Sequence, residues 1–162
     1  MNNRLFGFGV AVRYALVILC AFAVAGTAHS QSLPPKMPQT TPEKVLAEHI
    51  SALNACDWNR MMAQYDDDMV FLSKDGGIVQ GRQAIGEMFK KALQPPAKGG
   101  QCGMKMIVEK SFVVGNNVNV IMRAEAPFFA EPYRLSEVFE TRNGLLAAQV
   151  TTWDPNAIKM KK

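Results

Sequence analysis

Apolar residues recur at helical spacing in the first half of the chain and at strand spacing in the second half. The first helical stripe comprises Leu46, His49, Ile50 and Leu53. Thr41 is a good N-cap in front of this stripe, and Pro42 suits the first helical position, which needs no backbone N–H. The pattern therefore predicts an amphipathic helix that begins at residue 42.

Turn residues divide the stretch from residue 52 to residue 89 into short elements. Asp57 is a good cap for a second, short helix. The acidic run Asp66–Asp68 predicts a turn, Met69–Leu72 has strand propensity, and Asp75–Gly77 supplies the glycines of a tight turn. Gly81 then opens a third helix, which a pair of prolines ends.

The second half of the chain alternates apolar and polar residues as strands do. Long strands are predicted over residues 104–114, 118–124, 133–141 and 145–153. The predicted inward face of the first strand comprises Met104, Met106, Val108, Phe112 and Val114. Gly115–Asn117 and Asn143–Gly144 are hairpin signals. We therefore expect an α+β fold, a cone-shaped curved antiparallel sheet wrapped around three N-terminal helices, with a cavity at its wide end.

Three stretches carry a resemblance to a known family. They are ALNACDW at residues 52–58, AQYDDDMVFLSKDGG at 63–77 and VQGRQAI at 79–85. The sequence resembles the nuclear transport factor 2-like superfamily, in its SnoaL-like and ketosteroid-isomerase-like branch, over residues 42–154. The resemblance implies the NTF2-like or cystatin-like roll for residues 41–156. It implies little about function, because this fold hosts enzymes, binding modules and association domains.

The catalytic pattern of ketosteroid isomerases is absent from the matching positions. In those enzymes a tyrosine and an aspartic acid hold the oxyanion, and a second aspartate moves the proton. The matching positions here hold His49, Ser136 and Ser73. A serine without an adjacent base moves protons poorly, so steroid isomerase activity is not expected.

The N-terminal region has the organisation of a secretory signal peptide, assigned to residues 1–30. Arg4 and Arg13 accompany an apolar run, Tyr14–Ala25, that is too short to span a bilayer comfortably. Small residues follow, which predicts cleavage near Ala28 to Ser30 and a periplasmic or secreted protein. An uncleaved N-terminal anchor is the alternative, because the apolar count rises if residues 5–12 are included.

The remaining charge indicates no polyanionic partner. Of the 18 basic residues, Arg4 and Arg13 leave with the signal peptide, so 16 remain against 14 acidic residues. The basic residues are scattered except in a tail at residues 157–162, and no nucleic-acid partner is expected. Residues 31–40 are rich in proline and polar residues and predict a flexible leader.

Two cysteines, Cys56 and Cys102, follow the signal peptide. Export places them where disulfides persist, and a bridge between them would stabilise the fold by roughly 4 kcal/mol. Two separate buried thiols are the alternative.

His49 is the candidate catalytic residue, since it is the one histidine after residue 30 and lies on the apolar side of its helix. A neutral imidazole there would act as acid or base near pH 7, and a core histidine with one hydrogen-bond partner is the alternative. On the facing strand, alternation sends either Ser136 or Glu137 inward. An inward Glu137 would make an acid/base pair with His49.

The expected pocket residues come from several elements. They are Trp58, Tyr65, Phe71, Ser73, Met122, Arg134, Ser136, Gln149 and Trp153. The sequence has no metal-ligand cluster and no phosphate loop, so no cofactor is expected.

Three functions fit these observations. The first is an exported binding module that holds a small apolar or amphipathic molecule and dimerises through the outer sheet face. The second is a cofactor-independent lyase, isomerase or cyclase that uses His49 as acid/base. The third is an association domain whose Leu135 and Phe139 pack against a partner.

Overall fold

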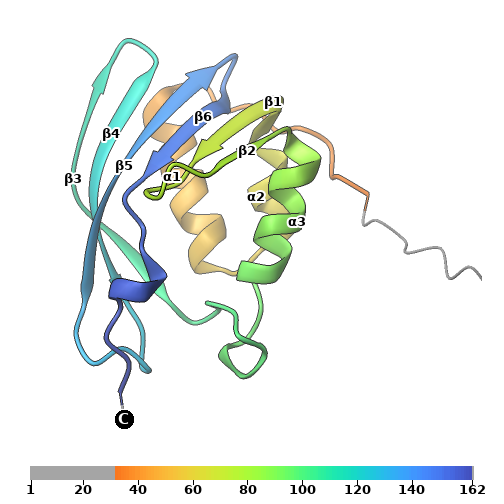
Figure 1. Cartoon of the computed structure of the whole chain (residues 1–162). Helices are drawn as coiled ribbons and strands as arrows, with labels where there is room; N and C mark the ends of the chain where they lie inside the picture. The colour runs from red at the N-terminus through yellow and green to blue at the C-terminus, as the bar shows by residue number, and fades with distance from the viewer. Residues whose placement is uncertain (1–31, 162) are drawn as a thin grey trace, which may run out of the picture. The chain divides into compact units, whose positions relative to one another are not determined.

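The computed structural model describes residues 32–161, which form three α-helices and a six-stranded sheet. The predicted signal peptide lies outside the described residues. Figure 1 shows the sheet curving around the helices, with no other helix or strand of residues 32–161 on its convex face. The predicted α+β cone is thereby confirmed. No helix in residues 32–161 has the length and apolar character needed to cross a membrane.

The helices begin where the sequence supplies caps. Helix α1 is Pro42–Asn54, and the Thr41 side chain accepts a hydrogen bond from the Lys44 N–H. Helix α2 is Trp58–Ala63, capped in the same way by Asp57. Helix α3 is Arg82–Ala92 and follows Gly81 without a side-chain cap.

The sheet has the strand order β2-β1-β6-β5-β4-β3. The strands are β1 Tyr65–Leu72, β2 Ile78–Gln80, β3 Lys105–Val114, β4 Asn117–Glu125, β5 Tyr133–Arg142 and β6 Leu145–Thr151. Neighbouring strands are antiparallel except β1 and β6, which pair in parallel. The prediction of a purely antiparallel sheet is therefore corrected at this one pairing. Short 3₁₀ turns at Pro96–Lys98 and Pro155–Ala157 complete the domain.

The predicted hairpin at Asn143 and Gly144 is confirmed by backbone geometry. Both residues have positive φ, 52° and 75°, as the tight turn between two twisted strands requires. A side chain at Gly144 would also meet the backbone carbonyl of Gln39 at 2.2 Å. Glycine is therefore needed both for the turn and for the close approach of residue 39.

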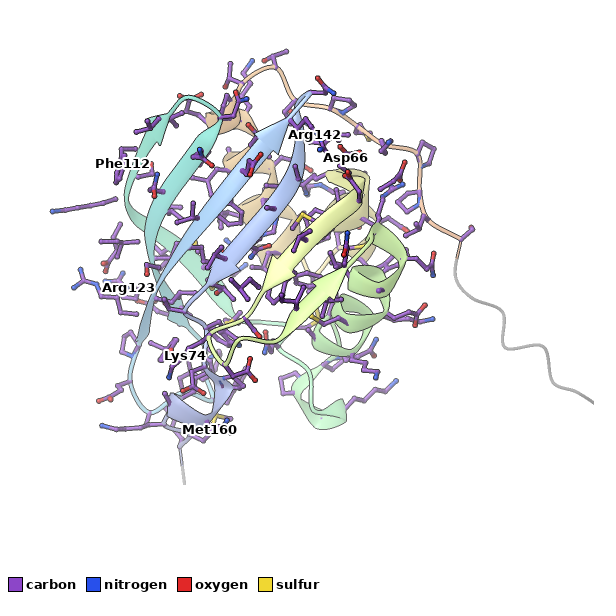
Figure 2. All side chains as sticks on the ribbon, turned by 45° about the horizontal axis from the view of Figure 1, so that its top comes forward. Asp66, Lys74, Phe112, Arg123, Arg142 and Met160 are labelled. Atoms are coloured by element: carbon purple, nitrogen blue, oxygen red, sulfur yellow. A yellow bond between two sulfur atoms is a disulfide. The ribbon has the colours of Figure 1, made fainter. Side chains whose placement is uncertain are left out.

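Two local predictions in the strands are corrected. Asp66–Asp68 lie inside β1 and form no turn. Arg142 pairs with Asp66 and Asp68, and Lys36 pairs with Asp66 and Asp67; Figure 2 shows Arg142 beside Asp66. In β3 the pairing shifts between Val108 and Lys110, which makes a bulge. The bulge reverses the alternation, so Phe112 and Val114, both 63% exposed, face outward where the pattern placed them inside. Val108, just before the bulge, is 39% exposed and is not part of the core either.

Residues 33–39, predicted as a flexible leader, are held against the domain. The backbone of Met37 donates to the Ala63 carbonyl, and the backbone of Gln39 donates to the Gly144 carbonyl. The buried Arg82 donates from its guanidinium to the Pro34 carbonyl at 2.5 Å. These contacts correct the leader prediction for this segment.

The core fills the space between the concave sheet face and the helices. Its fully buried side chains include Val45, Met61, Met62, Tyr65, Met69, Ile85, Met122, Phe139 and Leu146. A disulfide joins Cys56, at the bend between α1 and α2, to Cys102, just before β3, with the Cα atoms 5.5 Å apart. The bridge predicted from the sequence is present. It links the helical layer to the segment that leads into β3.

Candidate functional site

The open end of the cone contains a cavity with two chambers. The outer chamber has a volume of 530 Å³ and the inner chamber a volume of 70 Å³. Both are lined by Phe71, Phe89, Gln101, Thr151 and Trp153. Three of these five shared residues are aromatic, and we call this shared lining the aromatic neck.

The outer chamber lies between the β1–β2 turn, the end of α3 and the segment after β6. Ser73, Lys74 and Asp75 come from the turn, whereas Asp154 and Asn156 come from the C-terminal segment. The Lys74 ammonium and the Asp154 carboxylate are 2.6 Å apart and neutralise each other across the mouth. Figure 2 shows Lys74 at the same end of the molecule as Met160.

Glu137 is the acidic residue of the inner chamber. Alternation along β5 points its side chain into the core, where it is 8% exposed. Its carboxylate accepts hydrogen bonds from the Thr151 hydroxyl at 2.6 Å and from the Gln149 amide at 3.2 Å. Burial raises the pKa of Glu137 to about 7, although both hydrogen bonds act against this shift.

His49 lines the same chamber from α1 and is 2% exposed. Its ring centroid lies 5.0 Å from that of Phe139 and 6.1 Å from that of Tyr65. Burial lowers the pKa of His49 to about 4, because the apolar surroundings disfavour the imidazolium form. At neutral pH His49 is therefore an uncharged imidazole.

Several buried polar atoms around this chamber have no hydrogen-bond partner among residues 32–161. They are His49 Nδ1, Tyr65 Oη and Gln149 Oε1. Burial raises the pKa of the Tyr65 phenol, and the negative charge of Glu137 adds to the effect. Such unpaired groups are uncommon in protein interiors, and two of these three side chains, His49 and Gln149, line the inner chamber.

The structure divides the predicted pocket residues into two groups. Phe71, Ser73, Gln149 and Trp153 line the chambers, as does the candidate catalytic residue His49. Tyr65 and Met122 lie in the core, and the Trp58 indole donates to the Gly86 carbonyl between α2 and α3. Arg134 and Ser136 must be removed from the pocket, because they alternate with the inward residues of β5 and face outward.

The outward residues have partners of their own. Arg134 pairs with Glu109 at 2.5 Å, and the Ser136 backbone N–H donates to the Thr152 hydroxyl. Leu135 and Phe139, considered as partner contacts, are buried in the core instead.

Of the five residues that line both chambers, three were missing from the predicted pocket: Phe89, Gln101 and Thr151. Thr151 shares a strand face with Gln149 and Trp153, so alternation from those two predicted residues would have found it. Gln101 lies on an irregular segment next to Cys102, and no sequence pattern marks it. Residues 32–161 contain no group of three His, Cys, Asp or Glu side chains placed to hold a metal ion.

Comparison with known proteins agrees with this architecture. A family model described as SnoaL-like domain matches residues 46–149. No curated protein matches the chain.

Three solved structures, all below 25% identity, show the same fold. An NTF2-like protein of unknown function from Cytophaga hutchinsonii is 19% identical, with a TM-score of 0.58 over 73% of this chain and 94% of that chain. A cystatin fold protein from Novosphingobium aromaticivorans is 14% identical, with a TM-score of 0.60 over 71% and 100%. An LEH-like epoxide hydrolase of M. tuberculosis is 15% identical, with a TM-score of 0.57 over 70% and 82%.

Proposed function

Because the chain belongs to the SnoaL-like domain family, within the NTF2-like fold, we propose that it binds a small amphipathic molecule in the two-chambered cavity. The apolar body of this ligand occupies the outer chamber and the neck, and its polar group reaches the inner chamber. The observation that carries the proposal is that the two chambers share five lining residues and that the smaller one is lined by a buried carboxyl group.

The lining of the cavity supports this ligand class. Phe71, Phe89 and Trp153 supply flat apolar surfaces at the neck, and Met88 adds an adaptable side chain in the outer chamber. Glu137 and Gln149 supply polar groups at the inner end. Ligand sites commonly combine such an apolar wall with a few polar groups that fix orientation.

A fluorescent probe tests the proposal directly. N-phenyl-1-naphthylamine is an uncharged aromatic molecule that fluoresces in apolar surroundings, and we expect saturable binding to the protein. Ala92 lines the outer chamber near the end of α3, so Ala92→Trp fills space that the probe needs. Ala84 is exposed on the same helix, so Ala84→Trp is the matched control.

The proposal requires that Ala92→Trp weaken probe binding and that Ala84→Trp leave it unchanged. Equal affinity for the two variants would place the probe elsewhere on the protein. Circular dichroism of both variants checks that the added indole has left the fold intact.

Proton transfer on the bound molecule is a second candidate function, as in a cofactor-independent lyase, isomerase or cyclase. Glu137 favours it, because a carboxyl group with a pKa near 7 both takes up and releases protons at neutral pH. His49 is the weaker acid/base candidate, since burial holds the pKa of its imidazole near 4. This reassigns the acid/base role from His49 to Glu137.

Hydrogen exchange in D₂O tests the second candidate without a known substrate. A panel of small cyclic ketones is incubated with the protein, and exchange of the hydrogens next to the carbonyl is followed by NMR. Catalysis should increase as the pH rises through about 7 and disappear in Glu137→Gln. Exchange that persists in Glu137→Gln would exclude Glu137 as the base.

Export and dimerisation complete the proposal. Export is supported by the signal-peptide pattern and by the disulfide, which persists best in an oxidising compartment. Cell fractionation and the mass of the mature N-terminus test it.

Dimerisation is supported by apolar side chains exposed on the outer sheet face, namely Phe112, Ile121, Val138 and Val150. Val138 is paired with Val150 across β5 and β6, and Figure 2 shows Phe112 pointing away from the sheet. Exposed apolar side chains gathered on one sheet face favour a second copy of the chain as their cover. Sedimentation of the purified protein measures the oligomeric state.

A further inference from the structure

Glu137 has no cationic partner among the described residues, although it is buried. Its hydrogen bonds come from the neutral groups of Thr151 and Gln149. None of the residues that line the inner chamber is a lysine or an arginine. A buried carboxylate without a counter-ion is unfavourable, so a cation that reached Glu137 would be stabilised there.

The other polar atoms at this end of the cavity are suited to receive positive charge. Gln149 uses its amide N–H on Glu137, which leaves Gln149 Oε1 as an acceptor without a partner. His49 Nδ1 is also unpartnered, and the low pKa of this imidazole keeps it uncharged. Both side chains are more than nine-tenths buried and line the inner chamber.

The aromatic neck adds a third feature of the same kind. Phe71 and Phe89 are in edge-to-face contact with their centroids 6.3 Å apart, and Trp153 lines the same two chambers. Aromatic faces attract cations through their quadrupole, and the attraction strengthens when water is excluded.

The outer chamber carries no excess positive charge that would repel a cation. Lys74 is paired with Asp154, and Asp75 lies on the same rim. The two chambers are therefore lined by three carboxylates, Glu137, Asp75 and Asp154, against one ammonium. The net negative charge of this lining would repel an anionic ligand in both chambers.

We propose that the polar group of the ligand is an organic cation, an alkylated ammonium whose charge pairs with Glu137 and whose alkyl groups pack against the aromatic neck. This inference rests on the proposed binding function and narrows the ligand class to alkylated ammonium cations. The ligand thus supplies the positive charge for Glu137 that no residue among 32–161 provides.

Two probes that differ only in charge test this inference. Choline and 3,3-dimethylbutan-1-ol have nearly the same shape, but only choline carries a positive charge. Calorimetric titration of the full mature chain at pH 8 should show choline binding about tenfold or more tightly than the alcohol. Equal affinities for the two probes, or no choline binding, would overturn the inference.

Glu137→Gln and Glu140→Gln form a matched pair of variants. Both remove one carboxylate from β5, but Glu140 is exposed and faces outward. We expect Glu137→Gln to weaken choline binding about tenfold and to leave the alcohol unaffected, whereas Glu140→Gln should bind choline as the unaltered protein does. Equal loss in both variants would indicate a general charge effect and would overturn the assignment to Glu137.

The pH dependence supplies an independent readout. Choline keeps its charge at every pH, so its affinity should rise as Glu137 ionises near pH 7 and should be flat in Glu137→Gln. Among titratable groups, His49 lines the same chamber as Glu137, and the charge of Glu137 acts on Tyr65. The outer chamber adds Lys74, Asp75 and Asp154. His49 stays neutral and Tyr65 stays protonated across this range. A slope that survives in Glu137→Gln would contradict the proposed pairing.

Failure of this inference is distinguishable from failure of the binding proposal. If N-phenyl-1-naphthylamine binds and is excluded by Ala92→Trp while choline does not bind, the cavity still holds ligands but not cations. If neither probe binds, both proposals fail.

Discussion

The two faces of strand β5 carry similar side chains in opposite surroundings. The inward residues Leu135, Glu137 and Phe139 are buried, whereas Ser136, Val138 and Glu140 face away from the helices. Each face contains a carboxyl group and at least one apolar residue. The sequence composition of a strand therefore says little about its chemistry until alternation and sheet curvature decide which face encloses the cavity.

The comparison has a functional consequence for the acidic residues. The inward carboxyl group is desolvated and has a pKa raised to about 7. Outward carboxylates along the sheet are solvated and form ion pairs, as Glu109 does with Arg134. A group suited to proton transfer or to binding a cation thus arises from burial, without any special residue type.

Truncation of the apolar residues should give the largest contrast between the two faces. Phe139 is fully buried, so Phe139→Ala should lower the free energy of unfolding by about 3–5 kcal/mol. Val138 is 38% exposed, and Val138→Ala should change it by at most about 0.5 kcal/mol in the monomer. Urea denaturation of both variants with the disulfide intact measures the difference. Similar losses would mean that both faces are covered.

The acidic residues should give the next largest contrast, in the pH dependence of stability. The pKa of Glu137 in the folded protein is about 7, above its ordinary value of 4.5. The folded state therefore binds more protons than the unfolded state between these values. The stabilisation that Glu137 contributes to the folded state is fully present below pH 4.5 and is lost as the pH rises through 7. The free energy of unfolding changes by an amount on the order of 3 kcal/mol.

Glu137→Gln should remove this loss of stability, whereas Glu140→Gln should retain it. Urea denaturation at pH 4.5 and at pH 8 measures the effect in each variant. A loss that is the same in the two variants would assign it to another titrating group.

Much of the fold could be predicted from the sequence because its signals are local. The Thr41 cap and the Asn143–Gly144 turn depend on residues a few positions away, and both have the expected geometry. The β3 bulge depends on how the whole sheet curves, and no local pattern announces it. Asp66–Asp68 were predicted as a turn because three consecutive acidic residues are typical of turns. Their ion-pair partner Arg142 is more than seventy positions away in the chain, so local sequence could not reveal it.

The site was predictable only in part, for the same reason. Gln149 in β6 and Trp153 just after this strand could be assigned to the pocket by alternation. The choice between Ser136 and Glu137 stayed open, because period-two alternation gives two faces without saying which is inside. Gln101 is positioned by remote backbone contacts, such as the donation from its N–H to the Ala92 carbonyl, and sequence reasoning had no access to them.

Removal of the buried Thr151 hydroxyl should change the free energy of unfolding by less than removal of the Glu137 carboxyl group does. The Thr151 hydroxyl donates to Glu137 at 2.6 Å, so Thr151→Val should cost about 1–3 kcal/mol at pH 8. It should also raise the pKa of Glu137 further, because this hydrogen bond stabilises the carboxylate. The midpoint of the pH dependence measures the shift. Ser136→Ala, on the outward face, is the control and should move neither quantity.

The outer face should give the smallest change in monomer stability and a clear change in assembly. Val138→Glu places a carboxylate among the exposed apolar residues of the sheet, where solvent reaches it, so the free energy of unfolding should change by about 0.5 kcal/mol or less in the monomer. The same charge would be buried in a dimer that uses this face, and burying an unpaired charge opposes association. Sedimentation should therefore show dissociation of Val138→Glu but not of Ala84→Glu, whose exposed site lies on α3. A Val138→Glu protein that remains dimeric would show that the chain associates through another surface, and the apolar outer face would then need a different partner.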